Sequence, residues 1–136
     1  MPKRRVLILC TGNSARSQMA EGIFRHLAGD GFAVESAGTN PVGVNPLAVE
    51  AMREIGIDIG QQSSKSVSRF EGQSFDLVIT VCDNAAEHCP VFPGAPERLH
   101  WSLPDPAAVP GDHAQKMAAF RAVRDQLLDR TRSFLK

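Results

Sequence analysis

The sequence predicts an α/β fold of the flavodoxin-like type, with a four-stranded parallel sheet in the order 2-1-3-4 and helices on both faces. Two observations predict it. Short apolar runs alternate with amphipathic helical patterns along the chain, and the strongest candidate site follows directly after the first apolar run. Alternating strands and helices are typical of βαβ units and a covered parallel sheet. Ligands of such sheets bind beyond the carboxyl ends of the strands.

The first half of the chain contains two strand patterns and two helix patterns: a strand at 6–9, a helix at 18–28, a strand at 32–36 and a helix from Pro46 to Gly56. The first run, VLIL, is apolar throughout and indicates a buried strand. Asn45 followed by Pro46 predicts a helix start, because asparagine caps the free N–H groups and proline fits the first helical position.

The second half repeats the alternation: a short helical turn near 67–70, a strand at 75–81, a shorter strand at 99–103 and a final helix that begins at Asp112. The run at 75–81 is almost entirely apolar, which indicates a strand covered on both faces. Asp112 and Gln115 form a capping-box pattern. The residues expected to face inward from this helix are Met117, Phe120, Val123, Leu127 and Phe134.

Length and charge limit the possible functions. We expect one domain spanning residues 1–136 and a monomer. Fifteen Lys and Arg balance fifteen Asp and Glu, so no overall field recruits nucleic acid or a membrane surface. The apolar run after the basic start is too short for a signal peptide, and no later run could span a bilayer. We therefore expect a cytoplasmic protein, whose three cysteines suit transient rather than permanent disulfides.

The strongest candidate site is the segment CTGNSARS, from Cys10 to Ser17. A strand that ends in a polar turn and opens a helix directs several N–H groups at one point, which makes an anion site. There Cys10 would be favoured as a thiolate nucleophile, and Arg16 could bind a tetrahedral oxyanion through two N–H groups. The alternative is a buried cysteine and a solvated arginine. The residues expected to bind the oxyanion are Thr11, Gly12, Asn13, Ser14, Ala15, Arg16 and Ser17.

A second candidate group is Cys82 and Cys89. Cys82 follows the third strand, which the predicted order places beside the first, so it should lie towards Cys10. Asp83 predicts a short helix that reaches about Cys89. Two turns separate the two sulfurs by about 10 Å, so a disulfide between them requires partial unwinding. The alternatives are inert buried thiols or a zinc site; the spacing disfavours zinc, and we predict no metal.

The third candidate is Asp105, which stands between Pro104 and Pro106. Two prolines stiffen the loop, and a carboxyl held there suits a general acid that protonates a departing oxygen. The alternative is an ordinary aspartate in a turn.

These segments resemble the low-molecular-weight protein tyrosine phosphatase superfamily over nearly the whole chain. They are most similar to its thioredoxin-coupled arsenate reductases, in the loop with its extension QMAE, in the two later cysteines, and in SAG at 36–38 and HW before Asp105. The resemblance implies reduction of arsenate to arsenite, a role in arsenic resistance, thioredoxin as the electron donor and no other cofactor. It assigns Cys10 as nucleophile, Arg16 as oxyanion clamp and Asp105 as proton donor. Disulfides Cys10–Cys82 and then Cys82–Cys89 would form in turn.

Two positions depart from the resemblance. Many relatives carry a further cysteine where this chain has Ala15, and its loss should not harm the relay. Some relatives bind a monovalent cation near the positions of Asn13, Glu21 and Ser36, with an acidic residue at the position of Lys65. We hypothesise that the Lys65 ammonium replaces that cation by pairing with Glu21.

Two rival functions stay open. A phosphotyrosine phosphatase usually holds the substrate ring with aromatic residues beside the Asp-Pro pair. Here Ala107 and Ala108 follow it, the chain has no tyrosine, and two extra cysteines have no role. Weak phosphatase activity is still expected, because the loop cannot fully distinguish phosphate from arsenate. The other rival is a non-catalytic oxyanion or redox sensor, which would need no general acid such as Asp105.

Overall fold

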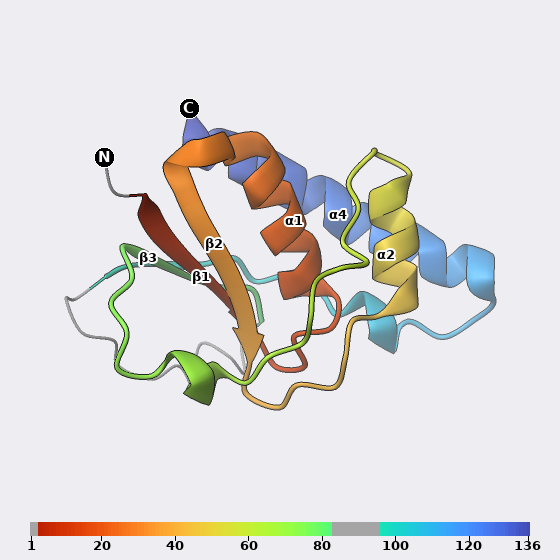
Figure 1. The fold of residues 1–136 in the computed structure, drawn as a ribbon. Helices are drawn as coiled ribbons and strands as arrows, with labels where there is room; N and C mark the ends of the chain where they lie inside the picture. The colour runs from red at the N-terminus through yellow and green to blue at the C-terminus, as the bar shows by residue number, and fades with distance from the viewer. Residues whose placement is uncertain (1–2, 83–95) are drawn as a thin grey trace.

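The computed structural model describes residues 3–82 and 96–136 (Figure 1). Four strands form one parallel sheet in the order β2-β1-β3-β4. Their bounds are β1 Arg4–Cys10, β2 Phe32–Gly38, β3 Leu77–Thr80 and β4 Glu97–His100. The predicted parallel sheet and its strand order are therefore confirmed.

Three α-helices pack against one another beside this sheet: α1 Arg16–Ala28, α2 Pro46–Arg53 and α4 His113–Leu135. Figure 1 shows α1 between β2 and α4, and α1 also contacts β1. Short 3₁₀ turns lie at η1 Gly29–Gly31, η2 Val67–Phe70 and η3 Pro106–Ala108. The helix expected from Asp83 to Cys89 lies outside the described residues.

The helix starts follow the sequence signals. Asn45 accepts a hydrogen bond from the Leu47 N–H at 2.8 Å, with Pro46 in the first turn of α2. Asp112 and Gln115 form the predicted capping box of α4. Each cap satisfies N–H groups that the helix itself leaves without partners. Within the described part of the chain, no helix is long and apolar enough to cross a membrane.

Several boundaries differ from the prediction by a few residues; for example, the strand expected at 75–81 is Leu77–Thr80. Two of these differences have a clear physical reason or consequence. The last strand, expected at 99–103, lies at Glu97–His100, because its polar first residues pair along an exposed sheet edge where an apolar pattern is not required. The first helix begins at Arg16 rather than near residue 18. Its N-cap residue is Ala15, which has no side-chain oxygen to bind the first-turn N–H groups. Those groups stay available to an anion.

The core lies between the sheet and the helices. Residues 6–9 of β1 are at most 1% exposed, as a central strand requires. Phe24 of α1 packs edge-on against Phe32, with ring centroids 5.4 Å apart, and it also contacts Phe134 of α4. The inward face predicted for α4 is buried at Met117, Phe120, Val123 and Leu127 and partly buried at Phe134.

Glu54 joins α2 to α4 and should make stability depend on pH. Its carboxylate accepts hydrogen bonds from Arg121 and Arg124, which lower the pKa of Glu54 from 4.5 to about 2. The stabilisation is therefore complete above pH 4.5 and is lost as the pH falls towards 2. We expect Glu54→Gln to lower the melting temperature at pH 7 by a few degrees, and the difference to shrink in acid. Melting curves of Glu54→Gln and of Glu71→Gln, an exposed control, across this range test it.

Candidate functional site

The first two cysteines lie at the same edge of the sheet. Cys10 ends β1 and is 2% exposed, and Cys82 lies two residues beyond β3 and is 5% exposed. The two strands are parallel neighbours, with Leu9 opposite Thr80. Thr11, the residue after Cys10, has its hydroxyl oxygen 3.3 Å from the Cys82 sulfur. Cys89 lies outside the described residues.

A cavity of about 340 Å³ opens over the loop that follows β1. Its wall brings together the first and third candidates from the sequence and adds a segment after β2: the lining residues are Cys10, Thr11, Gly12, Ser14, Ala15, Arg16, Val42, Asn45, Asp105 and Ala107. A larger cavity, of about 540 Å³, lies beside Glu21 and Gln62. The smaller cavity is lined by Cys10, the predicted nucleophile, so it is the candidate functional site.

Arg16 and Asp105 form one wall of this cavity. Arg16 donates a hydrogen bond from Nη1 to the Leu103 carbonyl at 3.0 Å, and its Nη2 lies 4.0 Å from Asp105 Oδ2. Asp105 Oδ1 accepts from the Ala107 N–H at 3.0 Å, which fixes the carboxyl at the start of η3. The side chain of Asp105 is 46% exposed. The carboxyl is thus both held in place and open to the cavity.

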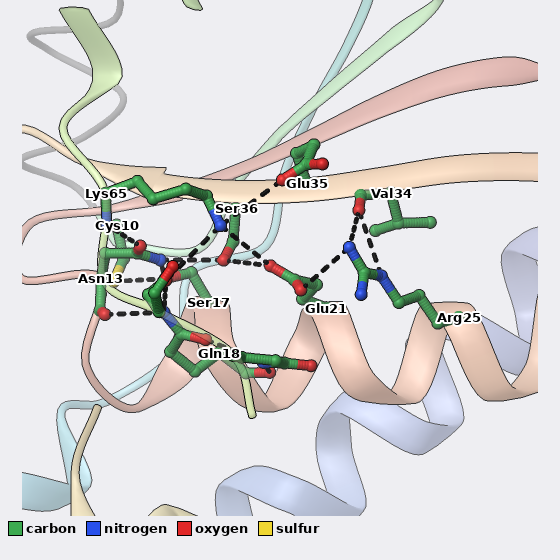
Figure 2. Close-up of polar contacts among 12 residues, drawn as sticks. Cys10, Asn13, Ser17, Gln18, Glu21, Arg25, Val34, Glu35, Ser36 and Lys65 are labelled. Atoms are coloured by element: carbon green, nitrogen blue, oxygen red, sulfur yellow. Dashed lines mark hydrogen bonds and ion pairs between the residues drawn. The ribbon is translucent and has the colours of Figure 1, made fainter. Parts of the chain in front are cut away.

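A directed chain of hydrogen bonds ends at the Cys10 sulfur (Figure 2). Ser36 donates to Glu21 at 2.6 Å, so its oxygen is able to accept from Asn13 Nδ2, at 2.9 Å. Asn13 Nδ2 also donates to Ser17 Oγ at 2.8 Å. Since Ser17 accepts that bond, its own proton can point to the Cys10 sulfur, 3.0 Å away. A hydrogen bond of this direction stabilises a thiolate.

Comparison with known proteins identifies the family of this chain. Residues 5–136 match the family described as low molecular weight phosphotyrosine protein phosphatase. The chain belongs to this family. Among its relatives is an arsenate reductase of Halalkalibacterium halodurans, 48% identical over 134 residues, which are 98% of this chain and 96% of the relative.

Two solved structures are also similar to this chain. An arsenate reductase in its oxidized state has a TM-score of 0.82 and 32% identity, over 97% of this chain and 96% of that chain. A thioredoxin-dependent arsenate reductase of Corynebacterium glutamicum has a TM-score of 0.66 and 28% identity, over 97% of this chain and 63% of that chain.

In this member of the phosphatase family, Glu21 is a buried carboxylate that is neutralised by side chains. It is 1% exposed; Arg25 lies 3.2 Å and Lys65 3.8 Å from its oxygens. Burial raises the pKa of Glu21, while the Ser36 hydrogen bond and the two cations oppose that rise. Lys65 also lies 3.4 Å from Glu35 (Figure 2). The expected Lys65–Glu21 pair is therefore present.

The Lys65 ammonium, 3.8 Å from Glu21 Oε1, places a positive charge beside this buried carboxylate, and we hypothesise that it takes the place of a monovalent cation. In the described residues, no group of three His, Cys, Asp or Glu side chains could hold a metal. We expect potassium chloride and sodium chloride at matched concentration to give equal turnover and equal melting temperatures. A rise in either quantity that is specific to potassium would contradict the replacement of the cation by Lys65.

Sequence reasoning missed side chains that support the loop after β1 through hydrogen bonds. Gln18, which is fully buried, donates from Nε2 to the carbonyls of Asn13 and Ser63, both at 3.0 Å. Gln62 donates to the Gln18 side chain at 2.7 Å. Gln18 entered the sequence analysis only as the first residue of the QMAE motif. A glutamine in the polar segment 60–74 carries no sequence signal of such a contact.

Proposed function

We propose that this chain reduces arsenate to arsenite with Cys10 as the nucleophile. The observation that carries the proposal is the joint placement of Cys10, Arg16 and Asp105 on one cavity, with Cys82 beside Thr11. A nucleophilic sulfur, an oxyanion clamp and a proton donor suit attack on a tetrahedral oxyanion. Relatives that cover nearly the whole chain are arsenate reductases, which supports arsenate as the substrate.

The first step joins sulfur to arsenic. The Cys10 thiolate attacks arsenate that is held by the loop N–H groups and by Arg16. One oxygen leaves as water after Asp105 gives it a proton. The product of this step is a covalent Cys10–arsenic adduct in which arsenic is still pentavalent.

The second step reduces arsenic. Cys82 attacks the Cys10 sulfur, the electron pair of the sulfur–arsenic bond goes to arsenic, and arsenite leaves. A Cys10–Cys82 disulfide is formed. The short link through Thr11 supports this step, because the loop that carries Cys10 already contacts Cys82.

The third step restores the nucleophile. Cys89 attacks Cys82, which frees Cys10 and leaves a Cys82–Cys89 disulfide. Two thiols of thioredoxin then reduce that disulfide, so the net reaction converts arsenate and a dithiol to arsenite, a disulfide and water. The thioredoxin-dependent relative from Corynebacterium glutamicum supports this choice of electron donor.

Cys82→Ser tests the relay. We expect arsenate reduction to stop, because no sulfur displaces arsenite from the Cys10 adduct, while slow hydrolysis of p-nitrophenyl phosphate continues. Ser133→Ala, on the exposed side of α4, serves as the control and should retain reduction. Arsenite release and p-nitrophenol release are measured on each protein.

Three results would contradict this scheme. Reduction by Cys82→Ser would remove Cys82 from the mechanism. Absence of both reactions in the parent protein would favour the non-catalytic sensor. After one equivalent of arsenate, mass spectrometry should find a Cys82–Cys89 bridge, and free Cys89 thiol at that stage would exclude the third step.

A further inference from the structure

Every backbone carbonyl from Thr11 to Ala15 accepts a hydrogen bond from a donor in the surrounding structure. The five bonds are Asn40 N–H to Thr11 at 2.8 Å, Val42 N–H to Gly12 at 3.0 Å, Gln18 Nε2 to Asn13 at 3.0 Å, Asn45 N–H to Ser14 at 3.0 Å and Met19 N–H to Ala15 at 2.9 Å. The carbonyl and the following N–H of a trans peptide point in opposite directions. Donors from the segment between β2 and α2 and from α1 therefore fix the orientation of these peptides and of the N–H group that follows each carbonyl.

The peptide between Gly12 and Asn13 is held more firmly than its neighbours. Its carbonyl accepts a second hydrogen bond, from the Ser64 hydroxyl at 3.1 Å. Ser64 is only partly buried and comes from a segment 52 residues further along the chain. The proposed reaction gives this hydroxyl no chemical step.

Rotation of the Gly12–Asn13 peptide would relieve backbone strain at Asn13. Asn13 has φ of 44°, the only positive φ outside glycine within the described residues. The left-handed conformation is unfavourable for residues with a Cβ, although asparagine tolerates it better than most. Gly12 allows a wide range of ψ, so the peptide plane can turn and return Asn13 to negative φ. Such a rotation would exchange the directions of the Gly12 carbonyl and the Asn13 N–H, next to the cavity that Gly12 and Ser14 line.

Other contacts of Asn13 do not replace this restraint. Its side chain is held by Ser17 and Ser36, and its Oδ1 accepts from the Lys65 N–H at 2.8 Å. These bonds fix the amide group of the side chain. The Gly12 carbonyl itself depends on two donors, the Val42 N–H and the Ser64 hydroxyl.

We propose that Ser64 is a positioning residue for oxyanion binding, which holds the Gly12–Asn13 peptide in the orientation that binds the anion. Without the Ser64 hydroxyl, the Val42 N–H is left as the donor to the Gly12 carbonyl and has to oppose the strain at Asn13. A fraction of the free protein then has the rotated peptide. The apparent affinity for an oxyanion falls by the fraction lost, whereas the bound protein has the correct orientation. The inference rests on the proposed function only in using arsenate as substrate.

The test is Ser64→Ala, compared with Ser64→Thr, which keeps the hydroxyl, and Ser68→Ala, an exposed serine nearby. The lost hydrogen bond changes the equilibrium between the two peptide orientations by about fivefold, so the Kd for inorganic phosphate and the KM for arsenate should rise by up to about fivefold, with kcat unchanged. Calorimetric titration gives the Kd and steady-state kinetics give KM and kcat. Both control variants should match the parent.

Two outcomes would overturn the inference. Unchanged Kd and KM in Ser64→Ala would show that the second donor does not matter. A lower kcat and melting temperature at unchanged KM, or a Ser64→Thr variant as weak as Ser64→Ala, would mean that Ser64 supports the fold only. Phosphate binding separates this inference from the proposed function, because a parent that fails to reduce arsenate still gives a phosphate Kd for each variant.

Discussion

Gly38→Ala is expected to lower kcat/KM for arsenate by about 100-fold, because it moves the catalytic loop away from its productive position. A Cβ at Gly38 would lie 2.5 Å from the Thr11 carbonyl oxygen and 2.8 Å from the Asn13 nitrogen. Both are backbone atoms of the loop that follows β1. Gly38 cannot retreat easily, since it pairs with Cys10 in the sheet and donates its N–H to the Lys65 carbonyl at 2.8 Å.

Gly31→Ala is the matched control, because a Cβ there meets nothing within 4 Å. Steady-state kinetics and melting curves of both variants separate displacement of the loop from loss of the fold. We expect Gly38→Ala to melt as a folded protein with weak phosphate binding, and Gly31→Ala to match the parent. If Gly38→Ala kept parental kcat/KM, the loop would tolerate displacement and the close approach of β2 would have no functional role.

The helices and strands were predictable from the sequence because they depend on local signals, and their alternation with a site after the first strand then indicated the strand order. Buried runs such as VLIL, caps such as Asn45 and Asp112, and the alternation of elements each act within a few residues. The strand at Glu97–His100 was misplaced because an edge strand buries little and needs no apolar pattern. Pattern reading thus works where burial dictates residue type and is weaker at a sheet edge.

The candidate site was predictable only in part, for a related reason. Cys10 and Arg16 belong to one short segment whose chemistry is visible in the sequence. The contacts that hold this segment come from remote positions, such as Ser64 and the carbonyl of Leu103. A backbone carbonyl or a serine in a polar stretch has no distinctive pattern, so its role appears only when the chain is folded.

Arg16→Lys is expected to lower kcat/KM for arsenate by about 10²–10³, the usual loss when an oxyanion donor is removed. Arg16 has enough N–H groups to bind the Leu103 carbonyl through Nη1 and still present others to the oxyanion. A lysine ammonium is a point charge that cannot keep that planar geometry. The substitution retains the charge, so any loss reports geometry rather than net attraction.

Arg132→Lys, at an exposed position of α4, controls for the exchange of arginine for lysine. The phosphate Kd of each variant separates weaker binding from slower chemistry.

Arg16 and Asp105 lie 4.0 Å apart, so their substitutions should not act independently. We expect Arg16→Lys and Asp105→Asn together to lower kcat/KM by less than the sum of their separate effects on the activation free energy, because both side chains act on the same oxyanion. If Arg16→Lys kept parental kcat/KM, Arg16 would act through its charge alone and not through the geometry of its N–H groups. Strictly additive losses in the double variant would mean that Arg16 and Asp105 act in separate steps.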